Sequence, residues 1–96
     1  MFVLVTYDVE TVSTEGQRRL RKVAKFCMNY GQRVQNSVFE CVIDPASFTK
    51  LRYQLLETID KEKDSIRFYL LGNNWNRKVE FIGKITSYDV NDSLII

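Results

Sequence analysis

Residues 31–43 read Gly-Gln-Arg-Val-Gln-Asn-Ser-Val-Phe-Glu-Cys-Val-Ile, with β-branched and aromatic side chains alternating with polar ones from Arg33 onward. This alternation is typical of a β-strand, in which successive side chains lie on opposite faces of a sheet. Asn36 and Ser37 in its middle are typical of a turn, so the segment predicts one bent strand or two short strands. The elements on either side of it decide between the possible folds.

The residues before this segment predict a strand and then a helix. Residues 2–9 are mostly apolar and β-branched, which indicates a strand. Thr14 and Gln17 make a capping box, after which apolar residues recur at helical spacing as far as Tyr30. We expect Gly31 to be the C′ residue that ends this helix.

The residues after the segment predict a second helix followed by strands. Asp44 and Pro45 are typical of an N-cap and the first position of a helix, which residues 48–59 continue with apolar residues at helical spacing. Residues 65–71 and 78–85 are strand candidates separated by a turn at residues 72–74. The predicted class is α+β, a ferredoxin-like βαββαβ fold with an extra C-terminal strand, in which two helices cover one face of an antiparallel sheet.

The chain of 96 residues is expected to be a single ferredoxin-like domain, with a core of about residues 1–85 and a C-terminal segment 86–96. One apolar sheet face has no helix in this fold, so we expect a homodimer that packs sheet faces. Residues 86–96, with Leu94 and Ile95, are expected to pair with the partner's sheet; alternatively, this tail folds back on its own chain or frays. Ser37 is expected at the interface, and Phe39 in the core or the interface.

The composition excludes several kinds of site. The chain has no histidine, which excludes Ser-His-Asp triads and histidine bases, and its four glycines are too scattered for a phosphate loop. Cys27 and Cys41 have no metal-ligand spacing and are expected to be buried small hydrophobic residues. Because no signal peptide and no apolar run of about 18 residues is found, we expect a cytoplasmic protein without a membrane span.

Carboxylate and metal chemistry remain, and Asp8 is the candidate residue. It ends an otherwise apolar strand, where a charge is costly to bury without a partner or a cation. The alternative is that Asp8 merely begins a polar loop. One carboxylate is a poor magnesium site, but a two-fold axis near the strand ends would supply Asp8 twice.

The basic residues are clustered, although a net charge of +2 is too small to prove a polyanionic partner. Nucleic-acid contacts are expected from a helix group and a smaller group beside Trp75: Arg18, Arg19, Lys22, Lys25, Arg77 and Lys78. Helical spacing places Arg18, Lys22 and Lys25 on one face, where they would bind phosphates independently of base sequence. The alternative is a solvated helix surface.

Several of these motifs together resemble one family. Tyr7-Asp8 at the strand end, the basic helix, Tyr30-Gly31 followed by Arg33-Val34-Gln35, and Ser37-Val38-Phe39-Glu40-Cys41 are similar to the CRISPR-associated protein two family, the small adaptation subunit. The resemblance spans nearly the whole chain and is weakest after Gly83. It implies a ferredoxin-like homodimer in which Asp8 of both subunits is the catalytic residue and the ligand of Mg²⁺ or another divalent cation such as Mn²⁺.

The resemblance also implies two functions, which both stay open. One is a magnesium-dependent endonuclease that cuts double-stranded DNA or single-stranded RNA, with a rate that falls on acidification because protonated ligands bind metal poorly. The other is a non-catalytic DNA-binding scaffold that bridges dimers of the CRISPR integrase subunit, CRISPR-associated protein one, during spacer acquisition. The ferredoxin-like fold suits DNA and RNA alike.

Overall fold

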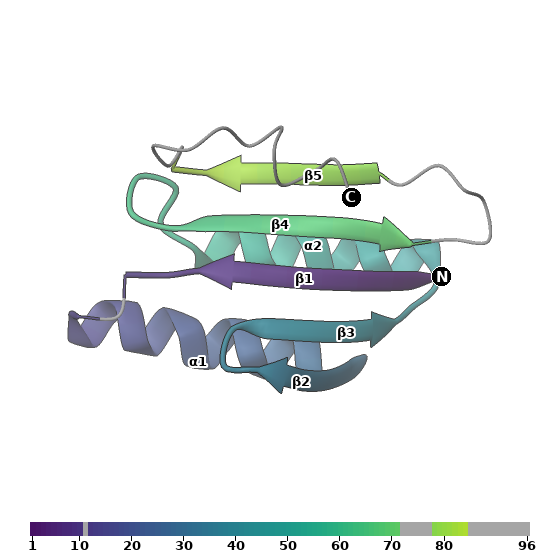
Figure 1. Cartoon of the computed structure of the whole chain (residues 1–96), viewed down its shortest axis with the longest axis horizontal. Coiled ribbons are helices and arrows are strands. Elements are labelled where there is room, and N and C mark those ends of the chain that lie inside the picture. The colour runs from purple at the N-terminus through teal and green to yellow at the C-terminus, as the bar shows by residue number, and fades with distance from the viewer. Residues whose placement is uncertain (11, 72–77, 85–96) are drawn as a thin grey trace.

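The structure is a computed structural model and describes residues 1–10, 12–71 and 78–84. Its elements, in chain order, are β1 (Phe2–Asp8), α1 (Thr14–Met28), β2 (Gly31–Gln35), β3 (Val38–Val42), α2 (Pro45–Thr58), β4 (Ser65–Leu71) and β5 (Lys78–Gly83). The strands of this part of the chain form one antiparallel sheet in the order β2-β3-β1-β4-β5 (Figure 1). The first four strands and the two helices make the predicted ferredoxin-like arrangement, and β5 extends the sheet beside β4.

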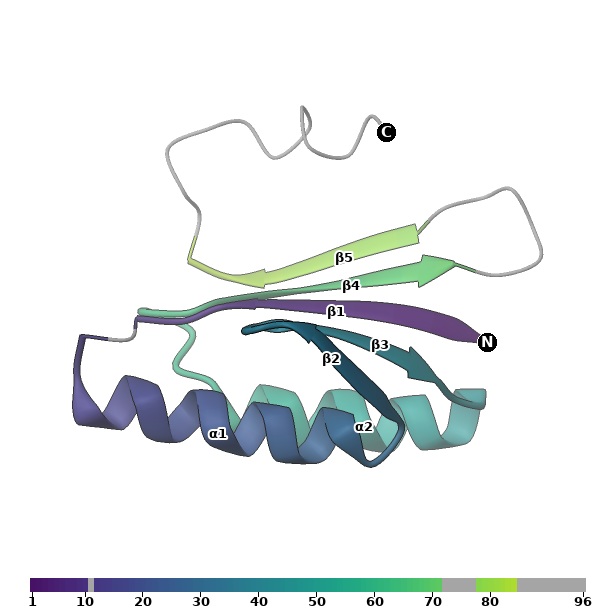
Figure 2. The same cartoon turned by 60° about the horizontal axis from the view of Figure 1, so that its bottom comes forward.

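Both helices lie against the same face of the sheet (Figure 2). Alternation along β1 buries Val3, Val5 and Tyr7 on this helix-covered face. Phe39 of β3 is the register partner of Val5 and is fully buried. Phe39 therefore belongs to the core of the subunit, which was one of its two predicted places; the other, a dimer interface, is corrected.

The two cysteines also lie in this core, as predicted. Cys27 of α1 and Cys41 of β3 are buried free thiols. The Sγ atom of Cys41 lies 3.6 Å from the backbone oxygen of Cys27, which ties the C-terminal end of α1 to the sheet. Both residues therefore act as small core side chains.

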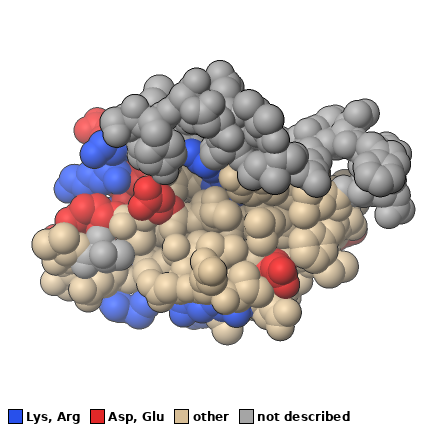
Figure 3. Space-filling view, viewed as in Figure 1, with Lys and Arg blue, Asp and Glu red and all other residues tan. Residues whose placement is uncertain are grey.

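No described helix covers the opposite face of the sheet. On this face lie the alternate residues of β1, from Phe2 to Asp8, flanked by Val42 of β3 and Leu71 of β4. Val42 is 71% exposed and Leu71 is 36% exposed. Uncharged residues form a broad band along the strands of this face (Figure 3). We call it the open face.

Segment 31–43 forms two short strands, which was one of the two predicted outcomes. β2 and β3 are joined at Asn36 and Ser37, and the backbone oxygen of Ser37 accepts a hydrogen bond of 2.9 Å from the amide of Tyr7. The β2–β3 turn therefore contacts the end of β1 directly. Ser37 is half-buried at this turn.

Two details at the ends of α1 differ from the prediction. The N-cap is Ser13 rather than Thr14, because Ser13 has an extended backbone and its hydroxyl accepts the Gly16 amide at 3.0 Å. The helix ends at Met28, and Gly31 opens β2 instead of serving as a C′ residue. A Cβ atom at Gly31 would lie 1.7 Å from the Glu40 oxygen, so close approach of the two strands explains this glycine.

Some predictions fall outside the described residues. These are the turn at residues 72–74 and the C-terminal segment 86–96 with Leu94 and Ile95. Neither described helix is long and apolar enough to span a membrane.

Candidate active site at the end of the first strand

Asp8 is the last residue of β1, the central strand of the sheet. It pairs with Ser65 of β4, and alternation along β1 places it on the open face, opposite to the buried Tyr7. Its side chain is exposed and makes no hydrogen bond or ion pair with any described residue. The described part of the chain therefore leaves the Asp8 carboxylate free to bind a ligand.

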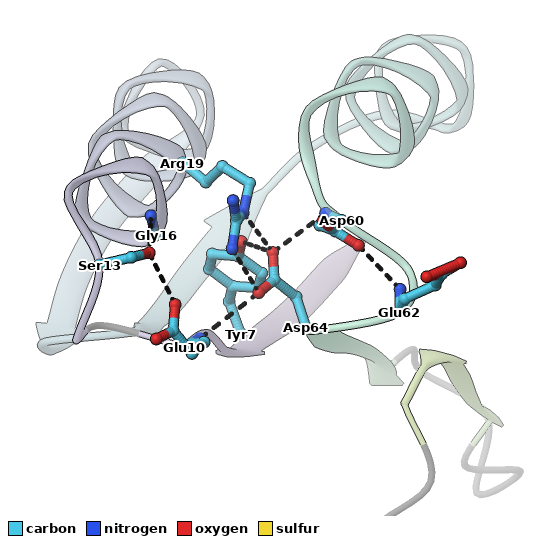
Figure 4. Close-up of polar contacts among 8 residues, drawn as sticks. All are labelled: Tyr7, Glu10, Ser13, Gly16, Arg19, Asp60, Glu62 and Asp64. Atoms are coloured by element: carbon cyan, nitrogen blue, oxygen red, sulfur yellow. Dashed lines mark hydrogen bonds and ion pairs between the residues drawn. The ribbon is translucent and has the colours of Figure 1, made fainter.

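The buried charge at this end of the sheet is Asp64, which directly precedes β4. Its carboxylate is fully buried and accepts hydrogen bonds from four other residues (Figure 4). The donors are the Tyr7 hydroxyl at 2.5 Å, Arg19 Nε at 2.7 Å and Nη2 at 3.1 Å, the Asp60 amide at 3.0 Å and the Glu10 amide at 3.4 Å. We call these five residues the Asp64 network.

The network shifts the proton affinity of its members. Burial alone raises the pKa of the Asp64 carboxyl, but hydrogen bonds from Arg19, Tyr7 and the backbone outweigh burial, so this pKa lies below its usual value. Burial, reinforced by Asp64, raises the pKa of the Tyr7 hydroxyl. Asp64 is therefore a carboxylate, and Tyr7 a neutral donor, throughout the ordinary pH range.

The loop between β1 and α1 is packed tightly beside this network. Glu10 Oε1 accepts a hydrogen bond of 2.7 Å from the hydroxyl of Ser13, the N-cap residue (Figure 4). A Cβ atom at Gly16 would lie 1.5 Å from the Glu10 backbone oxygen, so only glycine allows this approach of helix and loop. The carboxylate of Glu10 is thus engaged within the loop.

The predicted nucleic-acid residues fall into three groups. Arg18, Lys22 and Lys25 are exposed on α1. Arg19 is different, because its side chain is only 15% exposed and its guanidinium forms an ion pair with Asp64. Its assignment as a phosphate contact is corrected to a structural role. Arg77 lies outside the described residues, and Lys78 is described only as the first residue of β5.

The carboxylate ligands among the described residues fit a weakly held divalent cation. No cluster of three or more potential metal ligands occurs among the described residues. Asp8 supplies an exposed, unengaged carboxylate at the end of the central strand itself. Mg²⁺ is commonly held by one or two carboxylates together with water and substrate phosphate. A second subunit that contributes its own Asp8 would complete such a set.

Sequence reasoning missed two residues near Asp8. Asp64 belongs to the acidic stretch 57–64, where its charge resembles that of an ordinary exposed loop residue; its place directly before an apolar strand was the available signal. Arg67 of β4 lies opposite Thr6 and therefore shares the open face with Asp8. The two-residue period of β4 could have identified it.

Comparison with known proteins identifies the family. The family model described as CRISPR associated protein Cas2 matches residues 1–79, which contain β1, the Asp64 network and the segment 31–43. The chain belongs to this family. The resemblance drawn from residues 7–41 is therefore confirmed.

Individual Cas2 proteins are similar over almost the whole chain. CRISPR-associated endonuclease Cas2 of Halalkalibacterium halodurans is 60% identical over 95 residues, which cover 99% of both chains. CRISPR-associated endoribonuclease Cas2 of Nitratidesulfovibrio vulgaris is 56% identical over 96 residues, covering 100% of this chain and 94% of the relative.

The fold has solved counterparts among Cas2 proteins. The crystal structure of Streptococcus pyogenes Cas2 at pH 6.5 superposes with a TM-score of 0.73 and 61% sequence identity, covering 78% of this chain and 90% of that one. A second crystal structure of a Cas2 protein has a TM-score of 0.57 and 27% identity, covering 94% and 84%. The ferredoxin-like assignment therefore agrees with experimentally determined relatives.

Proposed function

We propose that this chain is a divalent-metal-dependent endonuclease of the CRISPR adaptation machinery, in which Asp8 is the metal ligand and catalytic residue. Membership of the Cas2 family supports the role in CRISPR adaptation. The names of the two similar relatives, an endonuclease and an endoribonuclease, support cleavage of phosphodiester bonds. The nucleic acid that is cut, DNA or RNA, differs between these names and is left to the experiment.

The exposed carboxylate of Asp8 carries this proposal. An aspartate that holds the fold together forms a cap, an ion pair or a hydrogen bond within the chain. Asp64 has such partners in abundance, whereas Asp8 makes none with the described residues. The two neighbouring carboxylates thus have different roles, and Asp8 is the one that faces solvent.

The active form we propose is a symmetric homodimer that packs two open faces together. Val42 and Leu71 expose apolar surface on this face, on strands that flank β1. Burying such residues against an identical face is favourable, and a two-fold axis near the ends of the β1 strands brings the two Asp8 side chains together. The dimer then supplies the second carboxylate that one subunit lacks.

The chain's own residues have distinct tasks in this function. Asp8 of each subunit holds Mg²⁺ or Mn²⁺, which when bound offsets phosphate charge and lowers the pKa of water. The exposed cations Arg18, Lys22 and Lys25 hold the nucleic-acid backbone through its phosphates. No histidine is available for proton transfer, so the reaction depends on the cation and solvent.

The test compares the wild-type protein with Asp8→Asn and with Glu62→Gln, a control that removes an exposed carboxylate from the α2–β4 loop. Each protein is incubated with duplex DNA and with single-stranded RNA, in Mg²⁺, in Mn²⁺ and in chelator. We expect cleavage by wild type and Glu62→Gln only with metal, and none by Asp8→Asn. Equal cleavage by Asp8→Asn, or by all proteins in chelator, would contradict the proposal.

A second function is supported by the position of the basic residues. Arg18, Lys22 and Lys25 lie on α1, which packs on the face of the sheet opposite to Asp8. A DNA-binding scaffold that bridges dimers of CRISPR-associated protein one needs this surface and not Asp8. Spacer acquisition in cells that carry Asp8→Asn distinguishes the two functions, since the scaffold alone predicts acquisition at the wild-type level.

A further inference from the structure

The Asp64 carboxylate contacts the chain on both sides of Asp8. It accepts the hydroxyl of Tyr7, the residue before Asp8, and the amide of Glu10, two residues after it (Figure 4). Tyr7 points into the core, whereas Asp8 points to the open face, so the anchor and the exposed carboxylate lie on opposite sides of one strand end. Any shift of this strand end must change both hydrogen bonds.

Asp64 itself is held by the surrounding elements. Its amide donates to the Asp60 oxygen at 2.7 Å, and its own oxygen accepts the Lys84 amide at 2.9 Å. The two bonds from Arg19 link its carboxylate to α1. Asp64 is therefore a fixed point to which the end of β1 is attached.

Stability alone does not account for a charge at this place. A buried ion pair often contributes no more to folding than apolar residues of the same volume, because both charges must leave water. The network instead restricts how the bonded groups are arranged, because directional hydrogen bonds allow fewer arrangements than apolar packing. The arrangement that it restricts is that of residues 7–10.

We propose that Asp64 is a positioning residue that, through Tyr7 and Glu10, sets the location of the Asp8 carboxylate at the metal site. The inference rests on the proposed function, because it assigns to Asp64 an effect on the metal that Asp8 holds. Asp64 touches neither metal nor nucleic acid in this role. Replacing a residue that orients a metal ligand typically weakens metal affinity by roughly 10-fold to 100-fold.

The test measures Mn²⁺ affinity of the purified full-length protein by electron paramagnetic resonance of free Mn²⁺. Tyr7→Phe keeps the buried ring and removes one hydrogen bond to Asp64, and Asp64→Asn removes the charge. The matched control is Glu80→Gln, which disrupts a different carboxylate–guanidinium pair, that of Glu80 with Arg52. Thermal unfolding of each variant shows that the affinity is measured on folded protein.

We expect Tyr7→Phe to weaken Mn²⁺ binding by roughly 10-fold, the lower end of the range for such residues, and Glu80→Gln to leave it unchanged. In cleavage assays, the Mg²⁺ concentration at half-maximal rate should rise for Tyr7→Phe, while the KM for nucleic acid stays constant. A general loss of stability would not change the Mg²⁺ requirement while leaving the KM for nucleic acid constant. If Asp64→Asn does not fold, Tyr7→Phe decides the question.

The outcomes separate this inference from the proposed function. If Asp8→Asn loses Mn²⁺ binding but folded Tyr7→Phe binds as tightly as wild type, the positioning role is wrong and the metal role of Asp8 stands. If Asp8→Asn binds Mn²⁺ like wild type, both are wrong. Unchanged metal dependence in a folded Asp64→Asn variant would likewise overturn the positioning role.

Discussion

The two aspartates at the end of β1 and the start of β4 show how burial divides similar residues between different tasks. Asp8 is exposed and makes no polar contact with a described side chain, whereas Asp64 is fully buried and accepts bonds from Tyr7 and Arg19. Breaking a buried pair by removing one partner leaves an uncompensated charge and costs about 3–5 kcal/mol. We therefore expect Asp64→Asn to destabilise the fold by about this amount, and Asp8→Asn to leave it nearly unchanged.

Asp64 also makes the stability of the fold depend on pH. Burial raises the pKa of its carboxyl, but the bonds from Arg19 and Tyr7 outweigh burial, so its pKa in the folded protein lies below the unfolded value of about 3.9. The folded state therefore binds fewer protons than the unfolded chain. The stabilisation is complete above the unfolded pKa and is lost as the pH falls through the folded pKa.

This dependence is measured by urea unfolding between pH 2 and pH 7. The difference in unfolding free energy between wild type and Asp64→Asn should be constant above about pH 5 and should shrink on acidification below about pH 4. The control is Glu62→Gln, which removes a carboxylate that is exposed in the folded protein. A difference that does not change with pH would show that the charge of Asp64 is irrelevant to folding.

At the scale of elements, the β2–β3 hairpin depends on the close approach of its strands at Gly31. A Cβ atom here would lie 1.7 Å from the Glu40 oxygen and 2.7 Å from the Cys41 Cα atom, which are backbone atoms that cannot rotate away. Gly31→Ala should therefore separate the strands and cost about 1–3 kcal/mol. Thermal or urea unfolding measures this loss, with Gln32→Ala at the neighbouring exposed position as control. Equal stability of the two variants would contradict the argument.

The α1 helix presents a basic surface that can be tested through salt. Each phosphate contact contributes about 0.9 to the slope of log affinity against log salt concentration on duplex DNA. Replacing Arg18, Lys22 and Lys25 together by alanine should reduce that slope by about 2–3 units. Fluorescence anisotropy on a labelled duplex at several salt concentrations measures the change.

The control for this helix removes the same number of positive charges elsewhere. Lys50, Lys61 and Lys63 are exposed on α2 and on the loop that follows it. Their triple alanine variant should keep the wild-type slope, because net charge alone contributes little at physiological salt. If both triple variants flatten the slope equally, the salt dependence comes from net charge in general and not from the specific surface on α1.

At the scale of the whole molecule, the open face predicts self-association. Val42→Asp places a charge beside Phe2 on the exposed apolar surface of the open face. A buried, unpaired carboxylate in a dimer interface is costly, so this variant should be monomeric in sedimentation velocity experiments in which wild type is dimeric. Val12→Asp makes the same change at a position that is 91% exposed in the β1–α1 region, and it should remain dimeric. A dimeric Val42→Asp would place the interface elsewhere.

Local patterns in the sequence determined the elements themselves. Residues 65–71 form β4 as predicted, and Asp44 and Pro45 begin α2 as its N-cap and first residue. Strand alternation and helical spacing involve residues only two to four positions apart, so the sequence contains them directly. The β-α-β-β-α-β order followed from these elements, and the order of the strands in the sheet from the fold class.

The same local reasoning also located Asp8, because a charge that ends an apolar strand is visible in the sequence alone. Its exposure on the open face follows from two-residue alternation along β1. The resemblance of residues 7–41 to the Cas2 family then supplied its role as a metal ligand, which stays a prediction. Helical spacing likewise placed Arg18, Lys22 and Lys25 on the surface of α1.

Only the tertiary structure decided which charges are engaged inside the fold. Arg19 and Asp64 are 45 residues apart in the chain, and Tyr7 and Asp64 are 57 apart, so no local pattern joins them. Sequence reasoning assigned Arg19 to nucleic acid and left Asp64 unassigned for that reason. The choice of Ser13 as N-cap and of Gly31 as a strand residue also depends on contacts that form when the elements pack. Folding brings these distant groups together, and thereby separates the buried Asp64 from the exposed Asp8.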